Sequence, residues 1–181
     1  MSIWKALENA VLDNSPNRQK LNAPEKISLQ EDDLLLLKEN DSAANEYMHH
    51  LILHTSEKLY NTEYYEPYVI GLFAVGMAVA RCDGRIVEEE KIEIGNFIDF
   101  ITHSELPQRY YDKMDAIKNM IFLNFNTAMS FVGQMHEDTW IVVDHLITLT
   151  IKADGQIATQ EIDFYRKWKS WLEAKSYERA I

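Results

Sequence analysis

The chain has 181 residues, of which 46% are hydrophobic and 26% are charged, and its formal net charge is −11. This composition excludes an intrinsically disordered chain and indicates one folded domain with room for an added arm. The excess of acids disfavours nucleic acid as the main ligand, because phosphate repels a negative surface, and favours a basic protein partner or divalent cations.

The start of the chain predicts short helical pieces joined by a linker. A brief apolar stripe runs from Ile3 to Val11, residues 13–27 have the composition of a linker, and Ser28 with Glu31 forms a capping box before the next helix. A further helix is predicted to begin at Asp41-Ser42. Its inward side would carry Tyr47, Met48, Leu51, Ile52 and Leu59.

The middle of the chain predicts a central helix followed by two amphipathic ones. Pro67 suits the first turn of a helix that runs to about Cys82 and is apolar on nearly all sides, so it should be buried on all sides. A helix over residues 88–102 follows. The next begins near Pro107, and we expect its buried face to carry Tyr110, Met114, Ile117 and Ile121.

Three more helices complete the expected order. Asn126 should cap a short helix that ends near Met135, and Asp138 should cap a helix over residues 140–153. The last helix, over residues 159–177, would bury Ile162, Tyr165, Trp168 and Leu172. Glycine and proline are scarce, and no alternating strand pattern appears.

One motif occurs twice: Asp83 and Asp154 each begin the pattern Asp-Gly-x-Ile-x-x-x-Glu. Each copy joins an apolar helix to an amphipathic one, so the chain contains two divergent copies of one helical hairpin. We therefore predict an all-α fold, a compact helical bundle of two related hairpins over residues 61–181, with an N-terminal helical extension over residues 1–60.

Turn and cap chemistry explains most of this motif without a ligand. Glycine ends a helix cheaply in the left-handed conformation, and a glutamate at the third helical position can accept a hydrogen bond from the N-cap amide. These roles fall on Gly84, Val87 and Glu90 in the first copy and on Gly155, Ala158 and Glu161 in the second. The two aspartates could accept hydrogen bonds from nearby turn amides.

Cation binding is the alternative explanation, because the pattern is also the second half of an EF-hand loop. Two EF-hands are excluded, since Val79, Arg81, Thr150 and Lys152 occupy the positions of the first ligands. A composite site remains open, in which Asp83, Glu90, Asp154 and Glu161 converge from both hairpins.

The quoted stretches AVARCDGRIVEEEKIEI and LTIKADGQIATQEIDFY, over roughly residues 65–175, resemble the TerB-like family of tellurite-resistance proteins. The resemblance implies a compact helical domain in a cytoplasmic bacterial setting, with a role in tellurite or other stress resistance. It also implies a divalent metal ion, Ca²⁺, Mg²⁺ or Mn²⁺, on the acids Asp83, Glu89, Glu90, Asp154 and Glu161.

Three other features give weaker indications of a functional site. Glu46, His50 and His54 share a helix face, which fits a solvated or partly buried face better than a zinc site. The cluster YNTEYYEPY, residues 60–68, suits either an interface or a rim around the central helix. Cys82 is the only cysteine, so no intrachain disulfide can form. This absence fits a protein of the reducing cytosol. Its expected role is that of a small buried apolar residue.

Neither an enzyme nor a membrane protein is expected. The chain has no nucleophile elbow, phosphate-binding glycine loop or paired cysteine motif, and its first residues do not have the pattern of a secretory signal. The longest charge-free stretch, residues 67–80, is too short to insert into a membrane. Two functions remain: a TerB-like cation-binding domain in stress resistance, or an acidic protein-interaction module such as an inhibitor or immunity protein for a basic toxin.

Overall fold

A computed structural model describes residues 42–102 and 105–179, and all regular structure within them is helical, which confirms the predicted all-α class. The predicted pieces between residues 1 and 41 lie outside the described residues. The described helices are α3 (Ser42–Leu59), α4 (Tyr65–Ala80), α5 (Glu88–Thr102), α6 (Gln108–Lys118), α7 (Phe125–Val132), the 3₁₀ helix η2 (Glu137–Thr139), α8 (Trp140–Lys152) and α9 (Thr159–Arg179).

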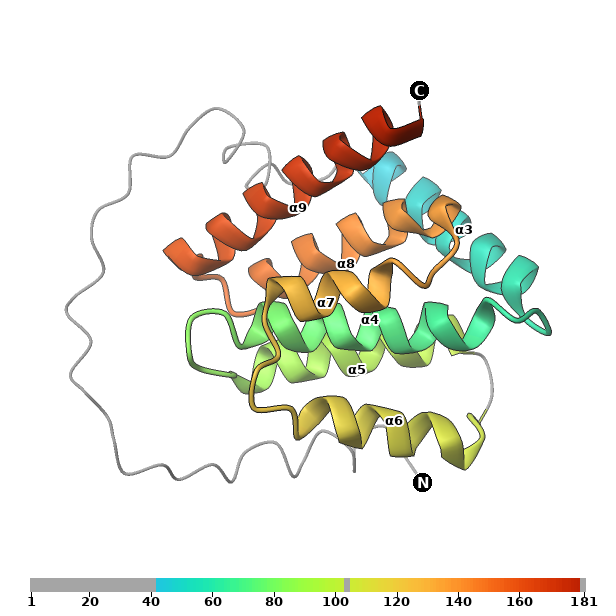
Figure 1. The fold of residues 1–181 in the computed structure, drawn as a ribbon, viewed down its shortest axis with the longest axis horizontal. Helices are drawn as coiled ribbons and strands as arrows, with labels where there is room; N and C mark the ends of the chain where they lie inside the picture. The colour runs from blue at the N-terminus through green and yellow to red at the C-terminus, as the bar shows by residue number, and fades with distance from the viewer. Residues whose placement is uncertain (1–41, 103–104, 180–181) are drawn as a thin grey trace.

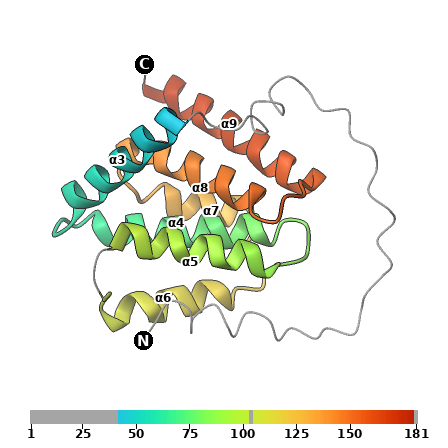
Figure 2. The ribbon, with the colours of Figure 1, turned by 180° about the vertical axis from the view of Figure 1, so that it is seen from behind.

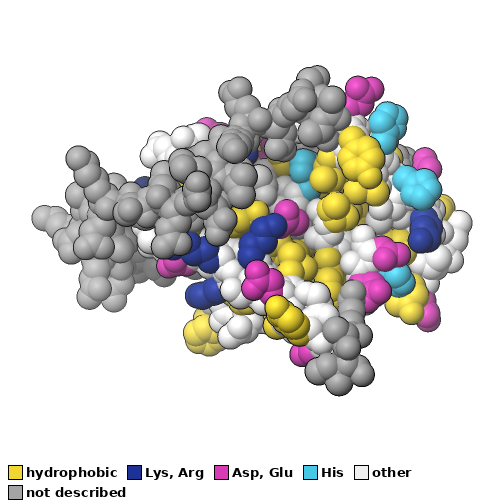
Figure 3. Space-filling model, turned by 90° about the horizontal axis from the view of Figure 1, so that it is seen from above, with side chains coloured by type: hydrophobic (Ala, Val, Ile, Leu, Met, Phe, Trp, Pro, Cys, Tyr) yellow, Lys and Arg dark blue, Asp and Glu magenta, His cyan; other side chains and the backbone are white. Residues whose placement is uncertain are grey.

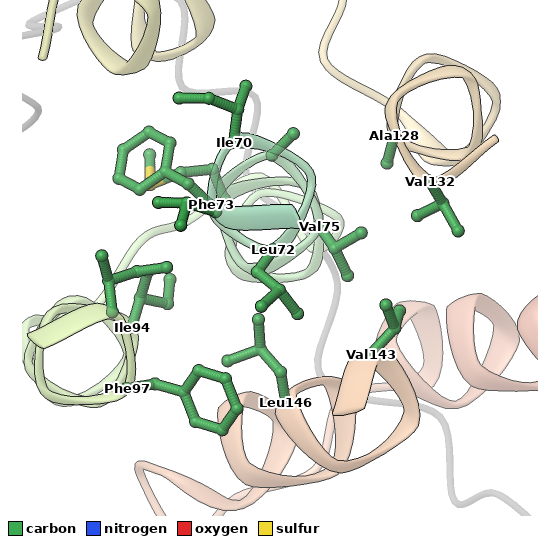
Figure 4. Close-up of a cluster of buried hydrophobic side chains, with 14 of the residues drawn as sticks. Ile70, Leu72, Phe73, Val75, Ile94, Phe97, Ala128, Val132, Val143 and Leu146 are labelled. Carbon is green, nitrogen blue, oxygen red and sulfur yellow. The ribbon is translucent and has the colours of Figure 1, made fainter. Parts of the chain in front are cut away.

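Helix α4 is the centre of the bundle, as its all-round apolar sequence predicts. Every residue from Tyr68 to Ala80 is buried, and α5, α6, α7 and α8 all pack against this helix. Figure 4 shows side chains of α5, α7 and α8 directed at α4, among them Ile94, Val132 and Leu146. None of the described helices is long and apolar enough to cross a membrane.

The two hairpins place both Asp-Gly turns at one end of the bundle. Helix α4 leads through the first turn into α5, and α8 leads through the second into α9. Helices α4 and α8 contact each other and run toward the same end, so the connections 81–87 and 153–158 lie together there in both Figure 1 and Figure 2. The connection between α6 and α7 reaches the same end in both views.

Helix α3 lies within the predicted N-terminal extension and packs against α5. Ile52 is fully buried, and the Ser56 and Tyr68 hydroxyls are 3.1 Å apart in a buried hydrogen bond. The expectation that Tyr47 points inward is wrong, because its side chain is 66% exposed. The aromatic cluster 60–68 divides: Tyr65 and Tyr68 are buried, whereas Tyr60 and Tyr64 are exposed around the start of α4.

Two predicted boundaries between α6 and α8 are wrong. Asn124, rather than Asn126, caps α7, because its side chain accepts a hydrogen bond from the Thr127 amide at 3.1 Å. The η2 turn precedes α8, and His136, rather than Asp138, accepts the capping hydrogen bond there. A single sequence contains several candidate caps in such polar stretches, and only the path of the backbone selects one of them.

Helix α9 is held on α8 by aromatic side chains. Trp168 is fully buried, and its indole N–H donates a hydrogen bond to Asp144 Oδ1 at 2.8 Å. The Trp168 and Trp171 rings stack at 5.5 Å, and Trp140 meets Trp171 edge-on at 4.9 Å. The expected burial of Ile162 and Trp168 is therefore confirmed, while Tyr165 and Leu172 are only half-buried.

Candidate functional site

Both Asp-Gly turns depend on a left-handed glycine, as the motif predicts. Gly84 has φ +84° and Gly155 has φ +73°. Each glycine amide donates a hydrogen bond to the carbonyl three residues earlier, from Gly84 to Arg81 at 3.0 Å and from Gly155 to Lys152 at 3.1 Å. Both positions have open space where a Cβ would stand, so the backbone conformation and not crowding requires glycine there.

The two motif aspartates stabilise their own turns. Asp83 Oδ1 accepts a hydrogen bond from the Arg85 amide at 2.7 Å, and Asp154 Oδ1 accepts one from the Gln156 amide at 2.8 Å. Such a bond from an aspartate to the amide two residues later closes an Asx turn. The repeat of this contact in both copies confirms that the two turns are equivalent.

The two motif glutamates cap the helices that follow. Glu90 Oε2 accepts a hydrogen bond from the Val87 amide at 2.9 Å, and Glu161 Oε2 accepts one from the Ala158 amide at 2.6 Å. This is the reach-back half of the predicted capping box. Both glutamates are buried, with exposed fractions of 6% and 5%.

The acids of the two turns share one electrostatic environment. Burial raises the pKa of Glu90 to about 7, and the negative charges of Glu161, Asp83 and Asp154 add to this shift. Burial likewise raises the pKa of Glu161 to about 7, with contributions from Asp83 and Asp154. The fold therefore brings together acids that are far apart in the chain. We call residues 83–90 and 154–161 the acidic end of the bundle.

Cys82, next to the first turn, is not an activated thiol. Burial raises the pKa of this thiol to about 12, and the charges of Glu161, Asp83 and Glu90 add to the shift. A nucleophilic cysteine needs the opposite, a lowered pKa beside cationic groups. The half-buried side chain packs against the hydrophobic core, in agreement with the expected apolar role.

The predicted metal ligands are only partly brought together. Asp83, Glu90, Asp154 and Glu161 meet at the acidic end, whereas Glu89 is exposed on the first turn of α5. In the described part of the chain, no three acidic, histidine or cysteine side chains form a group that could hold a metal ion. The composite metal site on these five residues stays a prediction.

The predicted face of α3 is solvated, and other histidines line a pocket. Glu46, His50 and His54 are all exposed. Figure 3 shows histidine side chains toward the α3 end of the upper face, among apolar and acidic ones.

A pocket of about 260 Å³ lies between α3, α5 and α8. Its lining is His49, Ile52, Glu93, Asn96, Phe97, Phe100, His145 and Leu149.

No sequence signal pointed to this pocket, because its polar residues are single side chains on three separate helices. Burial, and secondarily the nearby His49, lowers the pKa of His145, which favours the neutral imidazole. Burial raises the pKa of Glu93. The His49 ring lies 5.3 Å from that of Phe100, so aromatic packing contributes to the pocket wall.

The sequence also did not predict the exposed apolar residues in the connection between α6 and α7, at the same end of the bundle. The predicted burial of Ile121 is wrong: α6 ends at Lys118, and Ile121 and Phe122 are 89% and 79% exposed. Arg81 stabilises this helix end, because its guanidinium donates hydrogen bonds to the Lys118 and Met120 carbonyls at 2.5 and 3.1 Å. A cation that satisfies terminal carbonyls stabilises a helix end.

Comparison of the chain with protein-family models, with curated proteins and with solved structures found no match. The function must therefore be argued from the geometry of the acidic end, and the resemblance to the TerB-like family stays a prediction.

Proposed function

We propose that the chain is a non-enzymatic, acidic protein-interaction domain that binds a basic protein through the acidic end of the bundle. The observation that supports this most directly is the shared environment of the two turns: burial first, and then the acids of the other hairpin, raise the pKa of Glu90 and of Glu161. The exposed carboxylates gathered at this end, Glu89 and Asp154 among them, create a negative potential that attracts and orients a cationic partner.

The basic side chains near the acidic end pair with only some of its carboxylates, which supports the same proposal. Lys91 Nζ lies 2.6 Å from Glu88 Oε2, and Arg85 Nε lies 3.6 Å from Asp83 Oδ2. Arg81 donates hydrogen bonds to the backbone carbonyls of Lys118 and Met120. Glu89 and Asp154 stay exposed to solvent. With a net charge of −11 for the whole chain, the proposed partner is basic, as an inhibitor or immunity protein for a basic toxin would require.

Charge reversal at the acidic end tests this proposal. Glu89 and Gln160 occupy the same position in the two copies, and both are exposed. We expect Glu89→Lys with Gln160→Lys to weaken binding of an oligolysine peptide roughly tenfold at low ionic strength, and less at about 0.15 M salt, where screening is stronger. Titration calorimetry at both ionic strengths measures this difference.

The matched control makes the same change in charge elsewhere. Glu63→Lys with Asn45→Lys alters two exposed residues outside the acidic end. If both double variants lose the same affinity, the peptide senses only the net charge of the chain, and the proposed binding surface is wrong. Circular dichroism confirms that each variant keeps its helical content.

Divalent-cation binding is the second candidate, and the shared environment of Glu90 and Glu161 favours it. Each of these carboxylates has a pKa near 7 in the presence of the other acids, so a cation would compete with protons there. The resemblance to the TerB-like family supports the same candidate, with a cytoplasmic role in tellurite or other stress resistance. Each motif carboxylate accepts its turn or cap hydrogen bond with one oxygen, Asp83 Oδ1 or Glu90 Oε2 for example, so the other oxygen could coordinate a cation without loss of that bond.

Thermal unfolding of the metal-stripped protein tests the second candidate. With Ca²⁺, Mg²⁺ or Mn²⁺ at about one hundred times its dissociation constant, a bound ion would add about 2.7 kcal/mol to the free energy of unfolding. We expect a rise in Tm that grows as the pH increases through about 7 and disappears in Asp83→Asn with Asp154→Asn. An unchanged Tm with all three ions would exclude the metal site.

A further inference from the structure

The turn between α6 and α7 presents two large apolar side chains to water. Ile121 and Phe122 are 89% and 79% exposed, although Leu123, the next residue, is buried and Met120 is half-buried. Single exposed apolar residues are common on protein surfaces, but two adjacent ones at the tip of a turn form a local apolar projection. We call these two residues the apolar tip.

Hydrogen bonds hold the backbone on both sides of the apolar tip. Before the tip, Arg81 donates to the carbonyls of Lys118 and Met120. After it, the Thr127 hydroxyl donates to the Phe122 carbonyl at 2.9 Å, and Asn124 caps α7. The tip is therefore presented in a fixed conformation, which lowers the entropy that binding would cost.

The apolar tip lies at the same end of the bundle as the two acidic turns. On one side, Arg81 connects its backbone to the turn that contains Asp83. On the other side, the Phe125 ring packs edge-on against Phe164 of α9 at 5.1 Å. Figures 1 and 2 show the three connections at the same end of the bundle. An apolar centre with a charged surround is the usual anatomy of a protein-binding surface.

The charge around the apolar tip identifies the partner that fits it. A second copy of the chain would bring another net charge of −11 against the acidic turns, and an anionic lipid surface would be repelled in the same way. We propose that the apolar tip anchors a cationic amphipathic segment of a partner protein, whose apolar face covers Ile121 and Phe122 while its lysines and arginines face the acidic turns. This inference rests on the proposed interaction function and adds an apolar anchor to it.

Two synthetic peptides of equal composition test the anchor. One is a lysine–leucine helix with all leucines on one face, and the other has the same residues in an order that spreads the leucines around the helix. We expect the protein to bind the amphipathic peptide roughly tenfold more tightly. Ile121→Ser with Phe122→Ser removes this preference. The control, Tyr47→Ser with Tyr177→Ser, changes two exposed aromatic residues elsewhere on the surface and keeps the preference.

The outcomes separate failure of the anchor from failure of the proposed function. If the Ile121→Ser, Phe122→Ser variant still prefers the amphipathic peptide, the anchor is wrong, although the acidic surface stands. If neither peptide binds the unchanged protein at low salt, the proposed function itself fails. Sedimentation and binding to phosphatidylserine vesicles complete the test. Self-association or vesicle binding that the double variant abolishes would assign the tip to a second copy or to lipid, and would overturn the inference.

Discussion

Replacing Glu90 and Glu161 by glutamine is expected to raise the free energy of unfolding above pH 7 and to change it little near pH 4. Both carboxyls are buried, and burial raises their pKa from the ordinary 4.5 to about 7. The folded state therefore holds these two protons more tightly than the unfolded state does. The resulting stabilisation is fully present below about pH 4.5 and is lost as the pH rises through about 7.

The expected effect on the free energy of unfolding is large, although each substitution replaces a carboxyl group by an amide of nearly the same shape. One pKa unit corresponds to about 1.36 kcal/mol, so a rise from 4.5 to about 7 makes each ionised carboxyl cost on the order of 3 kcal/mol at pH 8. Glutamine keeps an oxygen that can accept the hydrogen bond from the Val87 or Ala158 amide, and it carries no charge. Because the two carboxyls interact, their titration midpoints belong to the pair.

Urea unfolding at pH 5 and pH 8 measures this prediction. The glutamine variant should gain stability at pH 8 and lose its advantage as the pH falls to 5. Glu89→Gln is the control, since Glu89 is exposed beside Glu90 and should change stability by only a few tenths of a kcal/mol. A variant that is less stable than the unchanged protein at both pH values would mean that the caps require a carboxylate, and the prediction would be wrong.

Trp168→Ala is expected to lower the free energy of unfolding by about 3 to 5 kcal/mol. Trp168 is fully buried between α9 and α8, and its N–H donates to Asp144 Oδ1. The substitution leaves a cavity and removes a stacking partner of Trp171. Asp144 keeps a hydrogen bond from Lys169 Nζ at 2.8 Å, so loss of packing dominates the cost. Domains are stable by only about 5 to 15 kcal/mol, so this loss is severe.

Tyr177→Ala is the control for Trp168→Ala, because it makes an alanine substitution in the same helix without removing a buried side chain. Tyr177 lies on the same helix but is 74% exposed, so its replacement should change stability by less than about 0.5 kcal/mol. Urea unfolding followed by circular dichroism compares the two variants. Equal small losses would show that α9 contributes little to the cooperative fold, contrary to the aromatic contacts between α8 and α9.

The parts of the site that depend on local chemistry were predictable from the sequence. The left-handed glycines and the glutamate caps involve residues within a few positions of one another, and each was correctly placed at Gly84, Gly155, Glu90 and Glu161. The burial of α4 was also predictable, since a helix without a polar face has no side to present to water. These features follow from short-range sequence patterns.

The remaining features depend on tertiary contacts that periodicity does not encode. The apolar spacing of α6 continues to Ile121, but Arg81, far away in the chain, captures the carbonyls at which the helix ends. Tyr47 has helical spacing that suits a buried face, yet its part of α3 has no neighbour to cover it among the described residues. The shared environment of Glu90 and Glu161 likewise arises only when the two hairpins pack together.

The complete enclosure of α4 has a consequence for the synthesis of the chain. The helices that pack most extensively against it, α5, α6, α7 and α8, all follow it in sequence, and the last of them ends at Lys152. An apolar helix therefore leaves the ribosome well before its partners exist. Exposed apolar surface of this kind promotes aggregation of incomplete chains and binding by chaperones. We therefore expect the partly synthesised chain to be more prone to aggregation than the finished domain.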